Sequence, residues 1–163
     1  MIYMGIDPGK GGGVAWQVVG GNGAVAEPMP PTVVGIRELF RDIVSSATTL
    51  SGEVGGALVA MEKVGGYIAG NKQPGSAMFN FGHNAGVLEM ACACYDLPTE
   101  LIAPQRWQKM LGLGTRGSRS RAAWKRKLKA RAEQLYPSVK VTLKTADALL
   151  LLEVARRLRK GGE

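Results

Sequence analysis

The sequence predicts an α/β fold in which a mixed five-stranded sheet is flanked by helices on both faces. Three observations predict it: strand-like segments near the start are joined by glycine turns, later strand-like segments alternate with helical ones, and 163 residues can bury one substantial core. Because chains of this length rarely form two domains, we expect a single domain over residues 1–163.

The N-terminal part reads as a meander. Residues 2–7 and 14–19 form the first two predicted strands, and the turn GGNG at 20–23 leads into a short third strand that ends at Glu27. Strand three therefore runs parallel to strand one. After the extended segment PMPP at 28–31, apolar residues take the spacing of an amphipathic helix at Ile36, Leu39, Phe40, Ile43 and Val44.

The rest of the chain alternates strands and helices. The last helix is apolar on nearly all sides at its start, so we expect it to pack centrally. The predicted elements are, in chain order, a strand at 57–62, a loop from 63 to about 77, a helix marked by apolar residues from Phe81 to Tyr95, a strand at 99–103, a short helix opening at Pro104, a helix marked by Trp124 to Leu135, and a last helix from about 145 to 160.

Positive charge is concentrated in the C-terminal part of the chain. Residues 1–100 carry five Lys and Arg against nine Asp and Glu, whereas residues 101–163 carry sixteen against four. From Arg106 to Arg131 there are ten basic residues and no acidic one. A solvated helix face usually mixes both signs, so this tract favours binding to a polyanion such as nucleic acid.

Composition disfavours several other functions. No apolar run approaches the roughly 18 residues that cross a bilayer, so we expect no membrane insertion. No signal peptide precedes the first strand, which predicts a cytoplasmic location. Gly9 and Lys10 lack the spacing and the following Ser or Thr of a nucleotide-binding loop, so no nucleotide cofactor is expected. Cys92 and Cys94, with one histidine in the chain, form no zinc set and are interpreted as small buried residues.

Three carboxylates are candidates for one metal site. Two predicted strands end on Asp7 and Glu62, and the meander followed by a helical crossover makes these strands parallel, so both acids fall at the same edge. Neighbouring strands about 4.8 Å apart would bring them within reach of one cation, which would relieve their repulsion. Asp147 falls in the first turn of the last helix behind Thr145, although the helix dipole favours an Asp there without any function. The segment GKGGG at 9–13 would let a backbone or a phosphate approach Asp7 closely.

Four segments, in this order, resemble the RuvC-type Holliday junction resolvases of the ribonuclease H-like superfamily, particularly the phage, prophage and organellar branch. They are GIDPGKGGGVAW, VAMEKVGG, FGHNAGVLEMACACYDLPTELIAPQRWQKMLGL and TADALLLLEVARR. The D-P-G-x-x-G signature is common to the superfamily, while the P-x-x-W-x-x-x-L-G-L segment and the A-D-A-L-L helix narrow the resemblance. The resemblance implies a ribonuclease H-like fold.

The resemblance also implies an endonuclease that cuts four-way DNA junctions. By it, Asp7, Glu62 and Asp147 would bind two Mg²⁺ ions per active site, with Mn²⁺ as a substitute, and the metal would assist water in attacking a phosphodiester. The implied products are symmetric paired nicks with 5′-phosphate and 3′-hydroxyl ends. Two opposed cuts need two sites, which implies a homodimer with the helix around 83–91 at its interface. The implied location is the nucleoid, a viral replication site or an organellar matrix.

One position departs from the family pattern. Family members usually carry Asp or His three residues before the last catalytic acid, and this chain has Lys144 there. A protonated lysine cannot bind a metal, so three explanations stay open: Lys144 contacts the scissile phosphate, another group serves in its place, or cleavage is weakened. His83 is a further candidate base or ligand, although a lone helical histidine is more often structural.

Basic and aromatic residues near the predicted site are candidates for DNA contact. Tyr67 or Phe79 would stack on an unpaired base at the crossover, unless Tyr67 is simply a loop aromatic, and Trp107 and Trp124 are interpreted as core. Phosphate contacts position DNA without reading its bases. The basic candidates are Lys10, Lys63, Lys72, Arg116, Arg119, Arg121, Lys125 and Lys129.

Two other functions stay open beside the nuclease that cuts junctions. One is a junction-binding protein with weak or lost cleavage, which Lys144 motivates. The other is a ribonuclease H-like nuclease that processes RNA. Only a resolvase should prefer a mobile four-way junction over a hybrid or a duplex.

Overall fold

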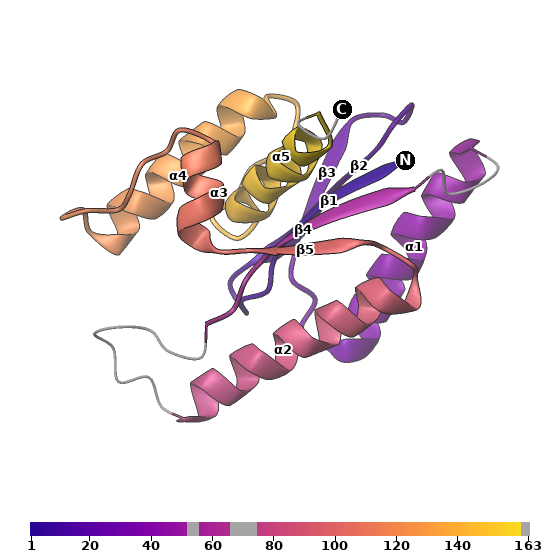
Figure 1. Ribbon diagram of the computed structural model, residues 1–163, viewed down its shortest axis with the longest axis horizontal. Helices are drawn as coiled ribbons and strands as arrows, with labels where there is room; N and C mark the ends of the chain where they lie inside the picture. The colour runs from indigo at the N-terminus through magenta and orange to yellow at the C-terminus, as the bar shows by residue number, and fades with distance from the viewer. Residues whose placement is uncertain (52–55, 66–74, 161–163) are drawn as a thin grey trace.

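The computed structural model describes residues 1–51, 56–65 and 75–160, and strands and helices follow one another much as predicted (Figure 1). The strands are β1 (Ile2–Asp7), β2 (Gly13–Val18), β3 (Ala24–Pro28), β4 (Ala57–Glu62) and β5 (Thr99–Ile102). The helices are α1 (Val33–Ser51), α2 (Gly75–Cys94), α3 (Pro104–Met110), α4 (Arg121–Leu135) and α5 (Ala146–Lys160).

The strands form one mixed sheet in the order β3-β2-β1-β4-β5. β1 pairs antiparallel with β2 and parallel with β4, with Ile2 opposite Ala57 and Ile6 opposite Met61. The predicted meander and the predicted parallel pairing are both confirmed. Continuing the same register by one residue brings Asp7 beside Glu62, at the edge where both strands end.

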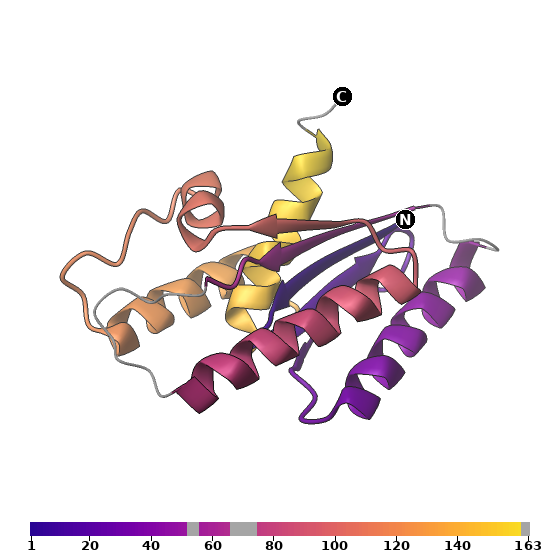
Figure 2. The ribbon, with the colours of Figure 1, turned by 60° about the horizontal axis from the view of Figure 1, so that its bottom comes forward.

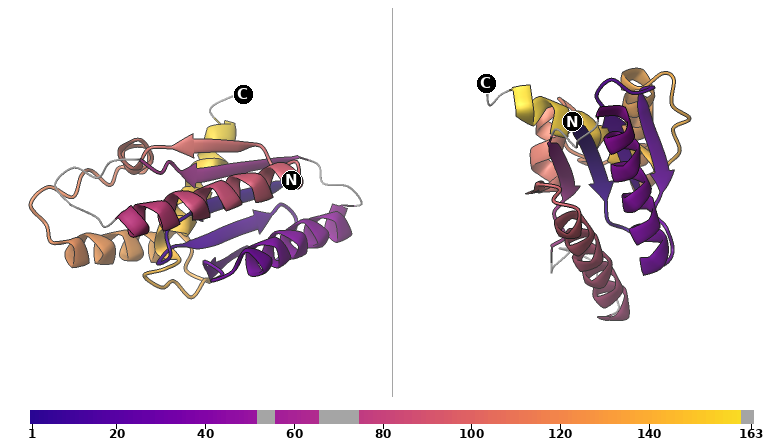
Figure 3. Two further views of the ribbon diagram at one scale, coloured as in Figure 1. Left: turned by 90° about the horizontal axis from the view of Figure 1, so that it is seen from below. Right: turned by 90° about the vertical axis from the view of Figure 1, so that its right-hand side faces the viewer.

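Helices cover both faces of the sheet, as predicted. Figure 2 shows α1 and α2 side by side beneath one face, and the left view of Figure 3, from below, shows α5 behind the sheet on the opposite face. Two hydrophobic clusters correspond to these layers: one joins α1 and α2 to the sheet, and the other joins α3, α4 and α5 to it. Among the described helices, none is long and apolar enough to cross a membrane.

The alternation of side chains along the strands decides which face carries the acids. In β1, Met4 and Ile6 are buried in the cluster of α1 and α2, so Gly5 and Asp7 point toward α5. The neighbours of Glu62 in β4 divide in the same way between the two clusters. Glu62 therefore turns to the same face as Asp7.

α5 lies directly on β1, and Gly5 is the point of closest approach. A Cβ atom at Gly5 would lie 2.1 Å from the carbonyl oxygen of Ala148 and 2.1 Å from the amide nitrogen of Leu152. Only glycine, which has no side chain, permits this contact. The leucines of α5 from Leu149 to Leu152 are fully buried, which confirms the central packing predicted for the last helix.

Two predictions need correction on the α2 side. α2 begins at Gly75, inside the segment predicted as a loop up to about residue 77. Cys92 is buried, but Cys94 is exposed. Positions two apart on a helix point to different sides, so one cysteine faces the core and the other faces outward.

We expect Gly5→Ala to destabilise the protein by at least about 3 kcal/mol, because the new methyl group would collide with the backbone of α5. Urea unfolding followed by circular dichroism measures this change. Gly11→Ala is the matched control, since a Cβ there meets no atom of the described residues within 4 Å, and it should change stability by about 0.5 kcal/mol or less. Equal stability of the two variants would contradict the close contact.

Candidate functional site

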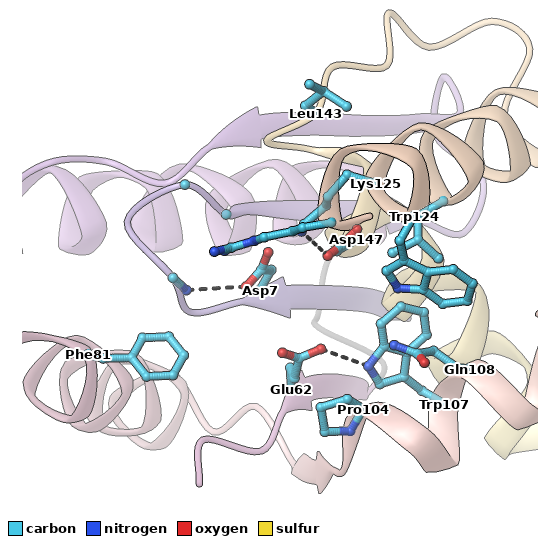
Figure 4. A pocket seen from close by; sticks show the side chains of 15 residues that line it. Asp7, Glu62, Phe81, Pro104, Trp107, Gln108, Trp124, Lys125, Leu143 and Asp147 are labelled. Carbon is cyan, nitrogen blue, oxygen red and sulfur yellow. Dashed lines mark hydrogen bonds and ion pairs between the residues drawn. The ribbon is translucent and has the colours of Figure 1, made fainter. Parts of the chain in front are cut away.

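A cavity of about 500 Å³ opens where β1 and β4 end, beside α3, α4 and the start of α5 (Figure 4). We call it the carboxylate cavity, because Asp7, Glu62 and Asp147 all line it. Three acids that lie far apart in the sequence are thus brought together by β1, β4 and α5. Their side chains point toward one another in Figure 4.

Asp7 is held at the end of β1 by the turn that follows. Its Oδ1 accepts a hydrogen bond from the amide of Gly9 at 3.3 Å. The backbone at Gly12 passes so close that a Cβ there would lie 2.6 Å from the Asp7 Cγ, so this glycine has to lack a side chain. Burial raises the pKa of Asp7 to about 6, and the charge of Asp147 adds to this effect, while Lys125 and the Gly9 amide oppose it.

Glu62 is held by a tryptophan. The Nε1 of Trp107 donates a hydrogen bond to the Glu62 Oε2 at 2.8 Å. Trp107 is fully buried in α3, which begins at Pro104 directly after β5, and β5 pairs with β4 at Glu62. Burial raises the pKa of Glu62 to about 7, and the charge of Asp7 adds to this, whereas the Trp107 hydrogen bond opposes it.

Asp147 lies in the first turn of α5, as predicted, and forms an ion pair with Lys125 of α4. The Lys125 Nζ contacts the Asp147 Oδ2. Burial by itself would lower the pKa of Lys125, but the charge of Asp147 and the hydrogen bond to it outweigh burial and raise the pKa above its ordinary value. The Asp147 Oδ1 is buried, and no group in the part of the chain that the structure describes forms a hydrogen bond with it.

These donors suit a hard divalent cation such as Mg²⁺, which prefers carboxylate oxygens. The buried Asp147 Oδ1 supports this, since an anionic oxygen without a partner is costly unless a cation satisfies it. Over residues 1–51, 56–65 and 75–160, however, no three acidic, histidine or cysteine side chains form a finished metal site. Trp107 and Lys125 instead hold two of the three carboxylates.

The basic candidates surround this cavity unequally. Arg121 and Lys125 line it and also line an adjoining cavity of about 530 Å³, which Arg116 borders as well. Lys10 and Lys144 are exposed and line a larger cavity of about 1220 Å³ beside α2. Lys144, which stands where the resemblance implies Asp or His, does not line the carboxylate cavity.

Other predicted residues lie farther out. Lys63 and Arg119 are exposed, and Lys129 is paired with Glu133 at 2.8 Å. Phe79 is 73% exposed and its ring stacks on His83. His83 is exposed and does not line the carboxylate cavity. Tyr67 and Lys72 lie outside the described residues.

Two side chains, Trp107 and Lys125, contact the carboxylates, a role that the sequence does not predict for them. Trp107 is core, as interpreted, but its indole also bonds Glu62. The sequence predicts that Lys125 contacts phosphates, whereas the structure pairs it with Asp147. The helical spacing of α4 could have indicated that Lys125 lies near α5, because Lys125 borders the apolar stripe of Trp124 and Leu128, which packs α4 toward α5.

No known family model matches this sequence, and no curated protein matches it. Among solved structures, the chain is similar to RuvC of Thermus thermophilus, at 17% identity over 99% of this chain and 97% of that chain, with a TM-score of 0.56. It is also similar to T. thermophilus RuvC in complex with a Holliday junction substrate, at 17% identity over 99% and 96% of the two chains, with a TM-score of 0.60. The fold of this chain is therefore the ribonuclease H-like fold of RuvC.

Proposed function

We propose that this protein is a structure-selective endodeoxyribonuclease that cleaves four-way DNA junctions by metal-assisted hydrolysis. The observation that carries the proposal is the convergence of Asp7, Glu62 and Asp147 in one cavity on a RuvC fold. Residues 1–163 would act as one ribonuclease H-like domain. A solved relative of this fold is bound to a Holliday junction, which supports branched DNA as the substrate.

Asp7, Glu62 and Asp147 would hold the metal, which we take to be Mg²⁺ with Mn²⁺ as a substitute; two ions per site is the number that the resemblance implies. Bound metal would supply a Lewis acid and a more acidic water. Hydrolysis adds water across the bond between phosphorus and the 3′ oxygen: the hydroxyl goes to phosphorus and the proton to the leaving oxygen. The ends are then a 5′-phosphate and a 3′-hydroxyl.

The chain's own cations would position the DNA. Arg121 lines the carboxylate cavity and both neighbouring cavities, so a phosphate at the carboxylates would lie within its reach. Arg116 on one side, and Lys10 and Lys144 on the other, extend this basic lining along two paths. Three of the four residues of the Gly9–Gly12 turn are glycines, which place no side chain beside Asp7 and would leave room for a nucleic-acid backbone.

Symmetric cleavage of two strands would require two copies of this site, so we propose a homodimer. α2 buries only Ala85, Leu88 and Cys92 among its described residues, whereas Phe79 and Met90 are 73% and 63% exposed. An exposed apolar helix face of this kind supports an interface between copies. The dimer would act at a nucleoid, a viral replication site or an organellar matrix.

A junction-binding protein without cleavage is the second candidate. Lys144 stands where the resemblance implies Asp or His, and Lys125 occupies an oxygen of Asp147, so both features leave fewer groups available to a metal. Incubating the protein with labelled four-way, hybrid and duplex substrates in Mg²⁺ or Mn²⁺ separates the candidates. Nicks in the junction support the resolvase, whereas binding without nicks at any metal concentration supports the binder.

Asp7→Asn, Glu62→Gln and Asp147→Asn should each reduce junction nicking by more than about 100-fold, a larger loss than an outer-shell change would cause. Junction binding, measured by gel shift at several salt concentrations, should stay largely intact and weaken steeply as salt rises. Full nicking by any of the three variants would count against the site.

The raised pKa values of Asp7 and Glu62 predict that the metal-free protein loses stability as pH rises. Both carboxyls bind protons more tightly in the folded chain than in the unfolded chain, so the free energy of unfolding falls between about pH 4 and pH 7. We expect a melting temperature at least about 3 °C lower at pH 8 than at pH 5 in a chelator. The double variant Asp7→Asn, Glu62→Gln should lack most of this difference, and an equal difference in both proteins would contradict the assignment.

Met90→Glu should weaken the proposed dimer at least about tenfold, because it places a charge in an apolar interface. Sedimentation equilibrium measures the dissociation constant. Val33→Glu is the control, since Val33 is a similarly exposed apolar residue on α1. If both variants dimerise equally well, the interface is not on this face of α2.

A further inference from the structure

Lys125 lies between two cavities of different character. Its ammonium contacts Asp147 in the carboxylate cavity, and the same residue lines the adjoining cavity with Arg116 and Arg121. The side chain of Lys125 is 30% exposed, so it is not locked into the core on every side. Its ammonium can therefore form an ion pair either with Asp147 in the carboxylate cavity or with an anion in the adjoining cavity.

The charges in the carboxylate cavity match one divalent ion rather than two. When all three carboxylates are ionised they carry three negative charges, and the ion pair with Lys125 cancels one of them. One divalent ion would neutralise the remaining two charges. A second ion would then meet a cavity with no negative charge left and with an ammonium already on Asp147, where close like charges repel.

We propose that Lys125 is a built-in cation that excludes the second metal ion until a DNA phosphate draws it away from Asp147. In the free protein, the site would hold one ion. When DNA binds, a phosphate beside Arg116 and Arg121 attracts the Lys125 ammonium, and the Asp147 carboxylate becomes available to a second ion. Metal loading would thus be completed only on the substrate. The inference rests on the proposed function and deepens it.

The fold makes Lys125 the residue suited to this role. Ser120 caps the start of α4 by accepting a hydrogen bond from the Ala123 amide at 3.2 Å, and Trp124 buries its ring beside Lys125, so the helix backbone at Lys125 is fixed. Only the side chain has to turn. Lys144 cannot take this part, since it lines the cavity beside α2 and not the carboxylate cavity.

Titration of the metal-free protein with Mn²⁺, followed by calorimetry without DNA, tests the proposal. We compare wild type with Lys125→Gln and with Arg126→Gln, which removes the same charge from the next residue of α4, an exposed position outside the carboxylate cavity. Wild type and Arg126→Gln should bind one ion per chain. Lys125→Gln should bind two ions, or one ion at least about tenfold more tightly.

A second titration uses wild type bound to a four-way junction that carries phosphorothioates around the crossover to slow cleavage. Here we expect two ions per chain. Should Lys125→Gln fail to fold, as judged by its melting curve, Lys125→Met keeps the alkyl packing and replaces it.

The outcomes separate the inference from the proposed function. Two ions in free wild type, or a Lys125→Gln titration within about twofold of wild type, would overturn the role of Lys125 while leaving a metal site in place. If wild type binds no Mn²⁺ in either titration, or if Asp7→Asn binds it equally well, the metal-dependent function itself fails.

Discussion

The contact between α5 and β1 at Gly5 is the constraint on which the rest of the site depends. A helix normally packs on a sheet through side chains, but here the helix backbone at Ala148 and Leu152 occupies the space where a Cβ of Gly5 would be. The first turn of α5 is thereby lowered onto the end of β1, and Asp147 reaches the neighbourhood of Asp7. A helix held away by one ordinary side chain would leave this acid above the sheet.

The alternation of side chains along β1 and β4 is the second feature that brings the three acids together. Asp7 and Glu62 face α5 because each ends a strand whose preceding residue faces the opposite layer. A shift of one residue in either strand would turn its acid toward α1 and α2. Strand register and helix depth together determine the site, while the long helices around it contribute mainly the hydrophobic cores that hold these two features fixed.

Much of this could be predicted from the sequence, because the signals were periodic and local. The meander, the parallel pairing of β1 with β4 and the buried last helix followed from alternation, turns and apolar stripes. The positions of Trp107 and Lys125 at the carboxylates could not be predicted in the same way, since they depend on how α3 and α4 settle over the sheet after folding. The start of α2 at Gly75 was missed because its first turn carries no apolar stripe, whereas the exposure of Cys94 could have been predicted, since it lies two residues away from Cys92 on the buried stripe.

The hydrogen bond from Trp107 to Glu62 has an optical consequence. Indole fluorescence changes when a charge or a proton lies near the ring nitrogen. Emission from Trp107 therefore changes when Glu62 binds a proton or a cation. Of the other two tryptophans, Trp124 lines the same cavity and Trp16 packs on the opposite layer. The molecule thus contains an intrinsic spectroscopic reporter of its own acidic centre, readable without any attached dye.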